Sequence, residues 1–161
     1  MSEKPGMDAL GQVPSGLFIV TCEGASGNHG VLASWVMQAG FMPPAVSVAI
    51  KQDRSIMRDL KPGAVFCVNQ LAKDDADSKA LMGAFAKGFP IGADAFEGQE
   101  LADGENGGKY LKNALSYLEC KLLRTLEPST EHNLVVGEIV GGGKLRDGEP
   151  WVHIRKNGAN Y

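Results

Sequence analysis

Residues 34–55 decide the fold that we expect, and they read SWVMQAGFMPPAVSVAIKQDRS. Residues 45–51 place small side chains between larger apolar ones, a pattern typical of a β-strand. The two prolines before them cannot both donate to a strand ladder, so residues 41–44 are expected to turn the chain. A basic residue and a serine, Arg54 and Ser55, then stand where a short helix is expected to start. The stretch therefore predicts a strand, a turn, a second strand and a helix start.

The composition favours a single β-rich domain. The chain has 161 residues, of which 43% are hydrophobic, and this is enough for one sizeable core. Its 21 glycines and 8 prolines favour short connections over long helices. A net charge of −3 with no evident basic face argues against a nucleic-acid partner.

Residues 1–10 are expected to be a loose lead-in, and residues 11–161 are expected to form the one domain. The lead-in, MSEKPGMDAL, lacks the apolar core of a signal peptide, and no later segment is apolar for long enough to span a bilayer. We therefore expect no membrane partner and a cytoplasmic location.

Strands are expected to outnumber helices along the chain. Runs of β-branched and aromatic residues predict strands over residues 17–22, 31–38, 45–51, 64–71, 114–126, 132–140 and 151–156. Periodicity alone leaves residues 114–126 open to a helix, and we favour a strand. Helices are predicted over residues 55–60 and 75–87, with loops over residues 23–30 and 90–108. Connections this short favour antiparallel pairing, and closure into a barrel would remove exposed sheet edges.

The cysteines and histidines give no sign of a disulfide framework or of a metal site. The cysteines stand far apart in apolar runs, where buried reduced thiols are expected; they are Cys22, Cys67 and Cys120. The histidines include no closely spaced pair, so no metal ligand is assigned. His132 opens a strand, where it could reach a ligand phosphate or ring, or have a structural role. Trp151, His153 and Arg155 alternate on one face of the last predicted strand.

Residues 53–55, Asp-Arg-Ser, form a candidate anion site at a helix start. Unpaired backbone N–H groups there attract negative charge. Arg54 could add a bidentate contact to a phosphate. Asp53 or Ser55 could cap the helix, and Ser55 could instead donate its hydroxyl to the phosphate. The alternative interpretation is a helix capped by Asp53 beside a solvated Arg54.

Trp35 and its polar neighbours form a candidate wall for a flat ligand. Ser34 and Gln38 carry hydrogen-bonding side chains within an otherwise apolar strand. A flavin ring needs an apolar wall together with polar partners for its carbonyls and ring nitrogens. A core tryptophan beside a strand serine is the alternative interpretation. Residues 24–30 do not read GxGxxG, so a Rossmann site is excluded.

Taken in order, these segments resemble the flavin reductase-like family of FMN-binding split barrels. The matching segments are VPSGLFIVT at 13–21, ASWVMQA at 33–39 with the prolines at 43 and 44, KQDRS at 51–55, FCVN at 66–69, FAKGF at 85–89, YLEC at 117–120, His132 with GEIV at 137–140, and VHIRKNG at 152–158. The likeness is greatest to flavoredoxin and to the flavin reductase module of flavodiiron proteins in oxygenic phototrophs, and we expect that module to stand alone here. Glu131, where many relatives carry Asp, and Gly40, where they often carry Ser, depart from the pattern.

The resemblance implies a mainly β fold, an antiparallel six-stranded split β-barrel of Greek-key type with short flanking helices. It also implies a homodimer with FMN in a groove near the dimer interface. No catalytic side chain and no metal ligand are implied. The residues that would bind the cofactor are Asn28, Ser34, Trp35, Val36, Gln38, Asp53, Arg54, Ser55, Lys87 and His132, with Arg54, Ser55 and Lys87 at the phosphate.

The function that follows from this resemblance is hydride transfer from NAD(P)H to FMN, by an NAD(P)H:flavin oxidoreductase. The electrons would then pass to an acceptor protein or leave as free reduced flavin. One alternative is an FMN-bound electron-transfer module that does not itself oxidise NAD(P)H. Another is a barrel that binds a different small ligand and has no redox role.

Overall fold

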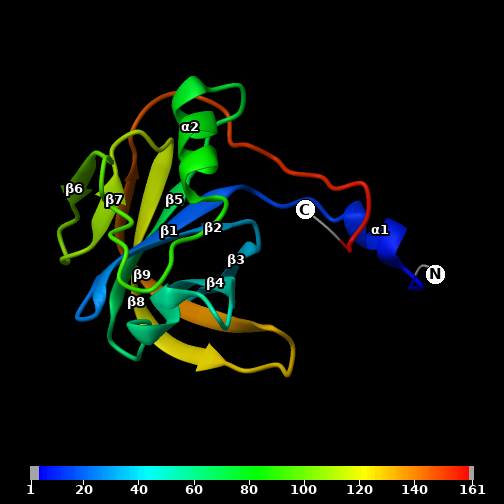
Figure 1. The fold of residues 1–161 in the computed structure, drawn as a ribbon, viewed down its shortest axis with the longest axis horizontal. Helices are drawn as coiled ribbons and strands as arrows, with labels where there is room; N and C mark the ends of the chain where they lie inside the picture. Colours follow the sequence, from blue (N-terminus) through cyan, green and yellow to red (C-terminus); the bar gives the residue numbers. More distant parts are fainter. Residues whose placement is uncertain (1–3, 160–161) are drawn as a thin grey trace.

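The computed structural model describes residues 4–159 and is built on one twisted antiparallel sheet (Figure 1). Within those residues the sheet has seven strands in the order β2-β1-β5-β8-β9-β4-β3. The strands are β1 (Phe18–Gly24), β2 (Gly27–Ala33), β3 (Val36–Phe41), β4 (Pro44–Lys51), β5 (Val65–Gln70), β8 (Ser116–Leu126) and β9 (His132–Lys144).

The expected mainly β, antiparallel architecture is confirmed, but the expectation of a split barrel with six strands is not, because the sheet has seven strands and does not close into a barrel. The sheet keeps two edges, β2 and β3, that are not hydrogen-bonded to each other in the described part of the chain. The extra strand arises because residues 31–38 are not one strand. β2 pairs with β1, whereas β3 pairs with β4, so the chain changes partner at Ser34 and Trp35. A tight hydrogen bond from the Val36 amide to the Ser34 carbonyl, 3.1 Å long, marks the break.

Other predicted boundaries also shift. The predicted loop at 23–30 is largely hairpin, because β1 and β2 pair up to Gly24 and Gly27. The predicted loop at 90–108 contains β6 (Leu101–Asp103), which pairs with β7 (Lys109–Leu111). The long strand at 114–126 is confirmed as β8. The predicted strand at 151–156 is instead an extended segment with one isolated β-bridge, between His153 and Ser15, and with backbone hydrogen bonds from Trp151 to Leu71 and from Arg155 to Gly11.

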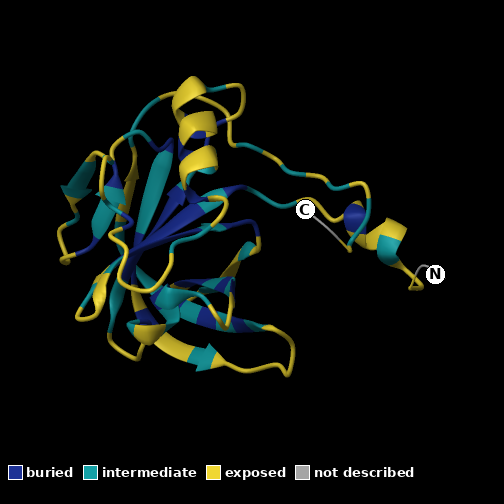
Figure 2. Cartoon of the chain, viewed as in Figure 1, coloured by how far each residue is buried: buried dark blue, intermediate teal, exposed yellow. Residues whose placement is uncertain are grey.

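The core lies on both faces of the sheet. On one face, Ile56 of the 3-10 turn η1 (Ser55–Arg58) is fully buried against strand residues such as Val48. On the other, α2 (Ala76–Phe85), within the helix predicted over residues 75–87, buries Leu81 and Phe85. The outer side of α2 faces solvent (Figure 2).

The two ends of the described chain run together as an arm that extends from the sheet (Figure 1). The amide of Arg155 donates to the Gly11 carbonyl at 3.1 Å, and the amide of Gly158 to the Met7 carbonyl at 2.7 Å. The expected loose lead-in therefore contains a helical turn, α1 (Met7–Gly11), while residues 1–3 lie outside the described residues. The C-terminal segment therefore runs out from the sheet and ends beside α1.

The three cysteines are free and buried, as expected. Burial raises the pKa of Cys22 and of Cys120 to about 12, so both thiols stay protonated at neutral pH. No helix within residues 4–159 is long and apolar enough to cross a membrane.

Candidate functional site

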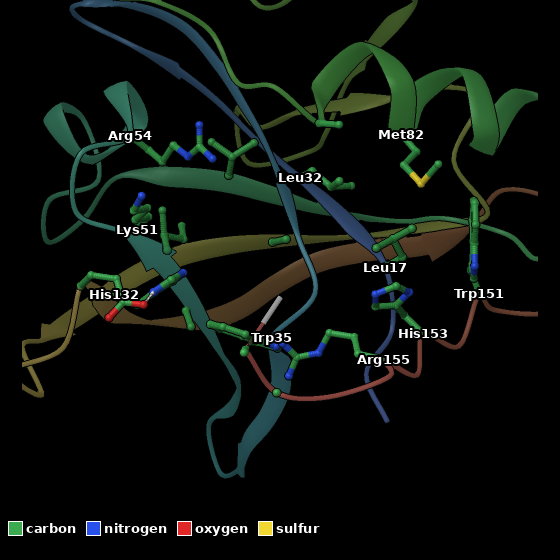
Figure 3. Close-up of a pocket in the computed structure, with 18 of the residues that line it drawn as sticks. Leu17, Leu32, Trp35, Lys51, Arg54, Met82, His132, Trp151, His153 and Arg155 are labelled. Atoms are coloured by element: carbon green, nitrogen blue, oxygen red, sulfur yellow. Dashed lines mark ion pairs between the residues drawn. The ribbon is translucent and has the colours of Figure 1, made fainter. Parts of the chain in front are cut away.

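A cavity of about 790 Å³ opens between β2, α2, the end of β4, the start of β9 and the C-terminal segment (Figure 3). Its two ends differ in chemistry. Lys51, Arg54 and His132 gather at one end, and Met82 and Trp151 lie at the other. The cavity is therefore cationic at one end and apolar at the other.

Arg54 is one of the cations at this end of the cavity, and backbone hydrogen bonds hold its main chain in place. Its amide donates to the Lys51 carbonyl at 3.1 Å, and its carbonyl accepts from the Met57 amide at 3.0 Å. Its guanidinium lies against the turn after α2, since a Cβ added at Gly88 would stand 2.3 Å from Arg54 Nη1. Gly88 also has a φ of +72°, a conformation that favours glycine.

The expected helix at 55–60 is a single 3-10 turn, and its cap differs from the expectation. Arg54 is the N-cap residue, and no side chain caps the turn, so neither Asp53 nor Ser55 has that role. A turn of 4 residues has little dipole. The positive potential at this end therefore comes from side-chain charges and not from a helix terminus.

Trp35 forms an aromatic wall at the side of the cavity. Its ring centroid lies 4.9 Å from that of His132, with the planes tilted by 51°. The guanidinium of Arg155 lies over the indole at 5.5 Å from its centroid. The carbonyl of Trp35 accepts from the Ala49 amide at 3.0 Å, which fixes the Trp35 backbone relative to β4. These contacts bring three parts of the sequence to one place.

Glu131 is the acidic residue of the cavity lining, and it sits beside His132. Its carboxylate lies 3.4 Å from His132 Nδ1. A hydrogen bond from its own backbone amide, with His132 and Lys51 nearby, lowers the pKa of Glu131. The lining includes one carboxylate and three cationic side chains, those of Lys51, Arg54 and Arg155, so its net charge favours anions.

Ser34 lies on the other side of Trp35 from this cavity. It is 1% exposed, and its hydroxyl has no hydrogen-bond partner among the described residues. Ser34 and Val36 line a second cavity of about 420 Å³ that shares Trp35 and Arg155 with the first. A buried hydroxyl without a partner costs free energy.

The predicted site residues divide into two groups. The residues that line the two cavities are Ser34, Trp35, Val36, Arg54 and His132. The residues that line neither are Asn28, Gln38, Asp53, Ser55 and Lys87.

The residues of the second group have other surroundings. The Asn28 amide donates to Asp94 at 3.1 Å, and the side chain of Asp53 is 70% exposed beside Lys51. Gln38 and Lys87 are exposed, although Lys87 directly precedes the Gly88 that touches Arg54.

Several lining residues were not predicted as ligand contacts, and some of them come from the C-terminal segment. The alternation of Trp151, His153 and Arg155 was the available signal, because all three line the cavity while the residues between them are exposed. Met82 carries no such signal, since a methionine on a helix reads equally well as core.

The match to known proteins covers almost the whole chain. The family model described as flavin reductase like domain matches residues 10–160. The chain belongs to this family. The expected resemblance is therefore confirmed.

Individual relatives agree with this assignment. The chain is 37% identical over 154 residues to "Diflavin flavoprotein A 1" of Synechocystis sp., an alignment that covers 95% of this chain and 26% of that protein. The chain thus spans about a quarter of the length of this curated relative.

Solved structures share the fold. The "NADH:FAD oxidoreductase SgcE6" of Streptomyces globisporus superposes with a TM-score of 0.79 at 24% identity, covering 91% of this chain and 85% of that one. "Flavin Reductase HpaC complexed with NADP+" gives a TM-score of 0.75 at 24% identity, covering 92% and 90% of the two chains. At this identity the similarity establishes the fold alone.

Proposed function

We propose that this flavin reductase-like domain binds FMN and transfers hydride to it from NAD(P)H, as an NAD(P)H:flavin oxidoreductase. The observation that carries the proposal is the cavity itself, in which the aromatic wall of Trp35 and the cations Arg54 and Lys51 share about 790 Å³. A mononucleotide of a flat ring and a phosphate needs both features in one cavity. Family membership supports a flavin as that ligand.

The residues present suit this cofactor. Arg54 and Lys51 would hold the phosphate, and Trp35 with His132 would flank the ring system. The Ser34 hydroxyl, buried without a partner among the described residues, would bond a polar edge of the ligand. Ser55 and Lys87, adjacent in sequence to Arg54 and Gly88, would add to the phosphate site in this proposal.

The protein's own part in the reaction is binding, orientation and exclusion of water. When bound, FMN supplies a ring that accepts a hydride and passes the electrons on. Trp35 and the C-terminal residues around Trp151 would limit the approach of the nicotinamide to one face of the cavity. No side chain of the site needs to act as an acid or a base, so no catalytic residue is assigned.

The acceptor and the oligomer belong to the same proposal. The electrons would pass to an acceptor protein or leave as free reduced flavin, and the chain would act as a homodimer. The exposed apolar tip of the β3–β4 hairpin, where Phe41 is 87% and Met42 97% exposed, supports burial by a second copy.

The test is a flavin titration followed by steady-state oxidation of NADH and NADPH. We expect FMN binding and turnover with at least one donor. If the protein holds flavin tightly but oxidises neither NADH nor NADPH, the result favours an FMN-bound electron-transfer module that does not itself oxidise NAD(P)H. A colourless protein that leaves added FMN fluorescence unchanged would favour a barrel for another ligand.

The phosphate assignment has its own test. Arg54→Ala and Ser55→Ala should each weaken FMN binding by about 1–3 kcal/mol, because charge-assisted contacts are lost. Arg58→Ala is the matched control, since Arg58 is an exposed cation at the other end of η1 that does not line the cavity. Unchanged affinity in Arg54→Ala and Ser55→Ala would remove both residues from the phosphate site.

A further inference from the structure

Asp59 joins the end of η1 to the β1–β2 turn. Its carboxylate accepts hydrogen bonds from the Ser26 amide at 3.2 Å, from the Ser26 hydroxyl, and from His29 Nε2 at 2.6 Å. The side chains of His29 and Asp59 are only 7% and 12% exposed. Burial alone would raise the pKa of Asp59, but the hydrogen bonds from Ser26 and His29 outweigh it and lower that pKa. The carboxylate is therefore charged at neutral pH.

This trio of Ser26, His29 and Asp59 does not have the geometry of a nucleophilic relay. Ser26 and His29 approach the same oxygen, Oδ2, so the histidine does not stand between the serine and the carboxylate. The arrangement instead fastens two backbone segments to one side chain.

The fastened segment leads directly to the phosphate end of the cavity. The amide of Asp59 donates to the Ile56 carbonyl at 3.1 Å, the amide of Met57 to the Arg54 carbonyl at 3.0 Å, and the amide of Arg54 to the Lys51 carbonyl at 3.1 Å. Ile56 is buried in the core, so the short turn has little freedom to relax. A shift of Asp59 would therefore move the backbone that carries Arg54.

Gly24 makes the close approach of Asp59 possible. A Cβ added at Gly24 would lie 2.2 Å from Asp59 Oδ2 and 2.4 Å from Asp59 Cβ. Contacts this short cannot be relieved by rotating the end of the carboxylate alone. Gly24→Ala would thus displace Asp59 without changing any charge.

We propose that Asp59, held by Ser26 and His29, is a positioning residue that sets the place of Arg54 for the phosphate of the bound flavin. This inference rests on the proposed function, because it needs Arg54 to contact that phosphate. It adds a contact network that lies outside the cavity and does not touch the ligand.

The direction in which FMN affinity changes when Asp59 is replaced distinguishes a positioning role from simple charge repulsion. Removing a negative charge near a phosphate strengthens binding if only Coulomb repulsion matters. Loss of the Asp59 contacts weakens binding if they position Arg54. A purely structural role lowers stability and changes the affinities for FMN and riboflavin alike, since riboflavin lacks the phosphate.

The experiment measures dissociation constants of FMN and riboflavin for the full chain and its variants. Asp59→Asn and Gly24→Ala should each reduce the preference for FMN over riboflavin by about fivefold, through a weakened phosphate contact. Ser26→Ala, at an exposed position, should act in the same direction and replaces Asp59→Asn if that variant does not fold. Asp103→Asn, which removes a carboxylate on β6 that pairs with Lys109 on β7, is the control that leaves the preference unchanged.

A double variant decides whether Arg54 carries the effect. In the Arg54→Ala background, Asp59→Asn should change the preference no further. Arg54→Ala could lose the preference for FMN while Asp59→Asn and Gly24→Ala keep or increase it. This outcome would overturn the positioning role of Asp59 and leave the phosphate assignment of Arg54 in place. Equal weakening of FMN and riboflavin binding in Asp59→Asn and Gly24→Ala would also overturn the positioning role. A wild-type chain with no FMN preference would overturn the phosphate assignment and this inference together.

Discussion

At the scale of single residues, the Ser34 hydroxyl is expected to have opposite effects on the stability of the ligand-free protein and on its affinity for flavin. Its hydroxyl is buried and has no hydrogen-bond partner within the described residues, so it costs stability in the absence of a ligand. Trp35, its neighbour, is 37% exposed and is held by the contacts of β4, His132 and Arg155. A polar group kept at a cost beside an accessible aromatic ring is consistent with a residue retained for a ligand.

Ser34→Ala should therefore leave the ligand-free protein as stable as the wild type, or more stable by up to about 1 kcal/mol. The same change should weaken FMN binding by about 1 kcal/mol, because the ligand loses one hydrogen bond. Thermal unfolding without ligand and a flavin titration measure the two effects.

Ser116→Ala is the control, because we expect it to change stability and not FMN affinity. The hydroxyl of Ser116 on β8 donates to Gln70 on β5 at 2.9 Å, and neither residue lines a cavity. This variant should lose stability and keep its FMN affinity. A Ser34→Ala variant that is strongly destabilised without ligand would show that its hydroxyl has a partner in the folded chain.

At the scale of secondary-structure elements, α2 depends on one charged contact. Asp75 caps the helix by accepting from the Ser78 amide at 2.8 Å, and both carboxylate oxygens accept from Arg146, at 2.7 and 2.6 Å. Arg146 also donates to the Asn113 carbonyl, so three distant segments meet at this cap. Hydrogen bonds from Arg146, with those from Ser78, hold the pKa of Asp75 far below its usual range.

Asp75→Asn should lower the free energy of unfolding by about 2 kcal/mol at neutral pH, since the bidentate ion pair is lost while the cap can be kept. The folded-state pKa of Asp75 lies below its unfolded value, so this stabilisation is present above pH about 4 and is lost as the pH falls further. Denaturant unfolding of both proteins from pH 7 to pH 3 measures the difference. A difference that stays constant down to pH 3 would contradict the assignment.

The elements also show what the sequence could and could not specify. β4 follows from its pattern of small and larger apolar residues, and β5 follows from a short apolar run that is buried on both faces. α2 follows from Leu81 and Phe85, which lie four residues apart on its buried face. β8 has no such clear periodicity, which is why residues 114–126 were also open to a helix. The break between β2 and β3 could not be read from the sequence, because it reflects a change of pairing partner and not a change of local propensity. The hairpin at 23–30 was obscured by glycines, one of which, Gly24, is required by the approach of Asp59.

The same contrast holds for the site. Trp35, Arg54 and His132 were assigned from residue type and family motif, and the fold brings them to one cavity. Asp53 and Gln38 are close to them in sequence but are exposed and line neither cavity, which residue type alone could not reveal. The cavity is completed by a C-terminal segment whose place depends on tertiary contacts with α1 and Ser15.

At the scale of the whole molecule, apolar side chains remain exposed on two projecting parts. The β3–β4 hairpin exposes Met37, Phe41 and Met42, and the C-terminal segment exposes Val152 and Ile154. Figure 2 shows much of the arm as exposed. Adjacent exposed groups of this size usually mark an interaction surface, and the proposed homodimer would cover them.

A charged hairpin tip should therefore dissociate the dimer. In the double variant Phe41→Glu with Met42→Glu, two carboxylates would be buried without partners at the interface, which should weaken self-association by about 2 kcal/mol or more. Light scattering over a dilution series measures the mass of each protein. Ile91→Glu is the matched control, because Ile91 is also apolar and 68% exposed but lies outside the hairpin. A wild-type chain that is monomeric at every concentration, or a double variant that still dimerises as the wild type does, would show that the hairpin tip does not form the interface.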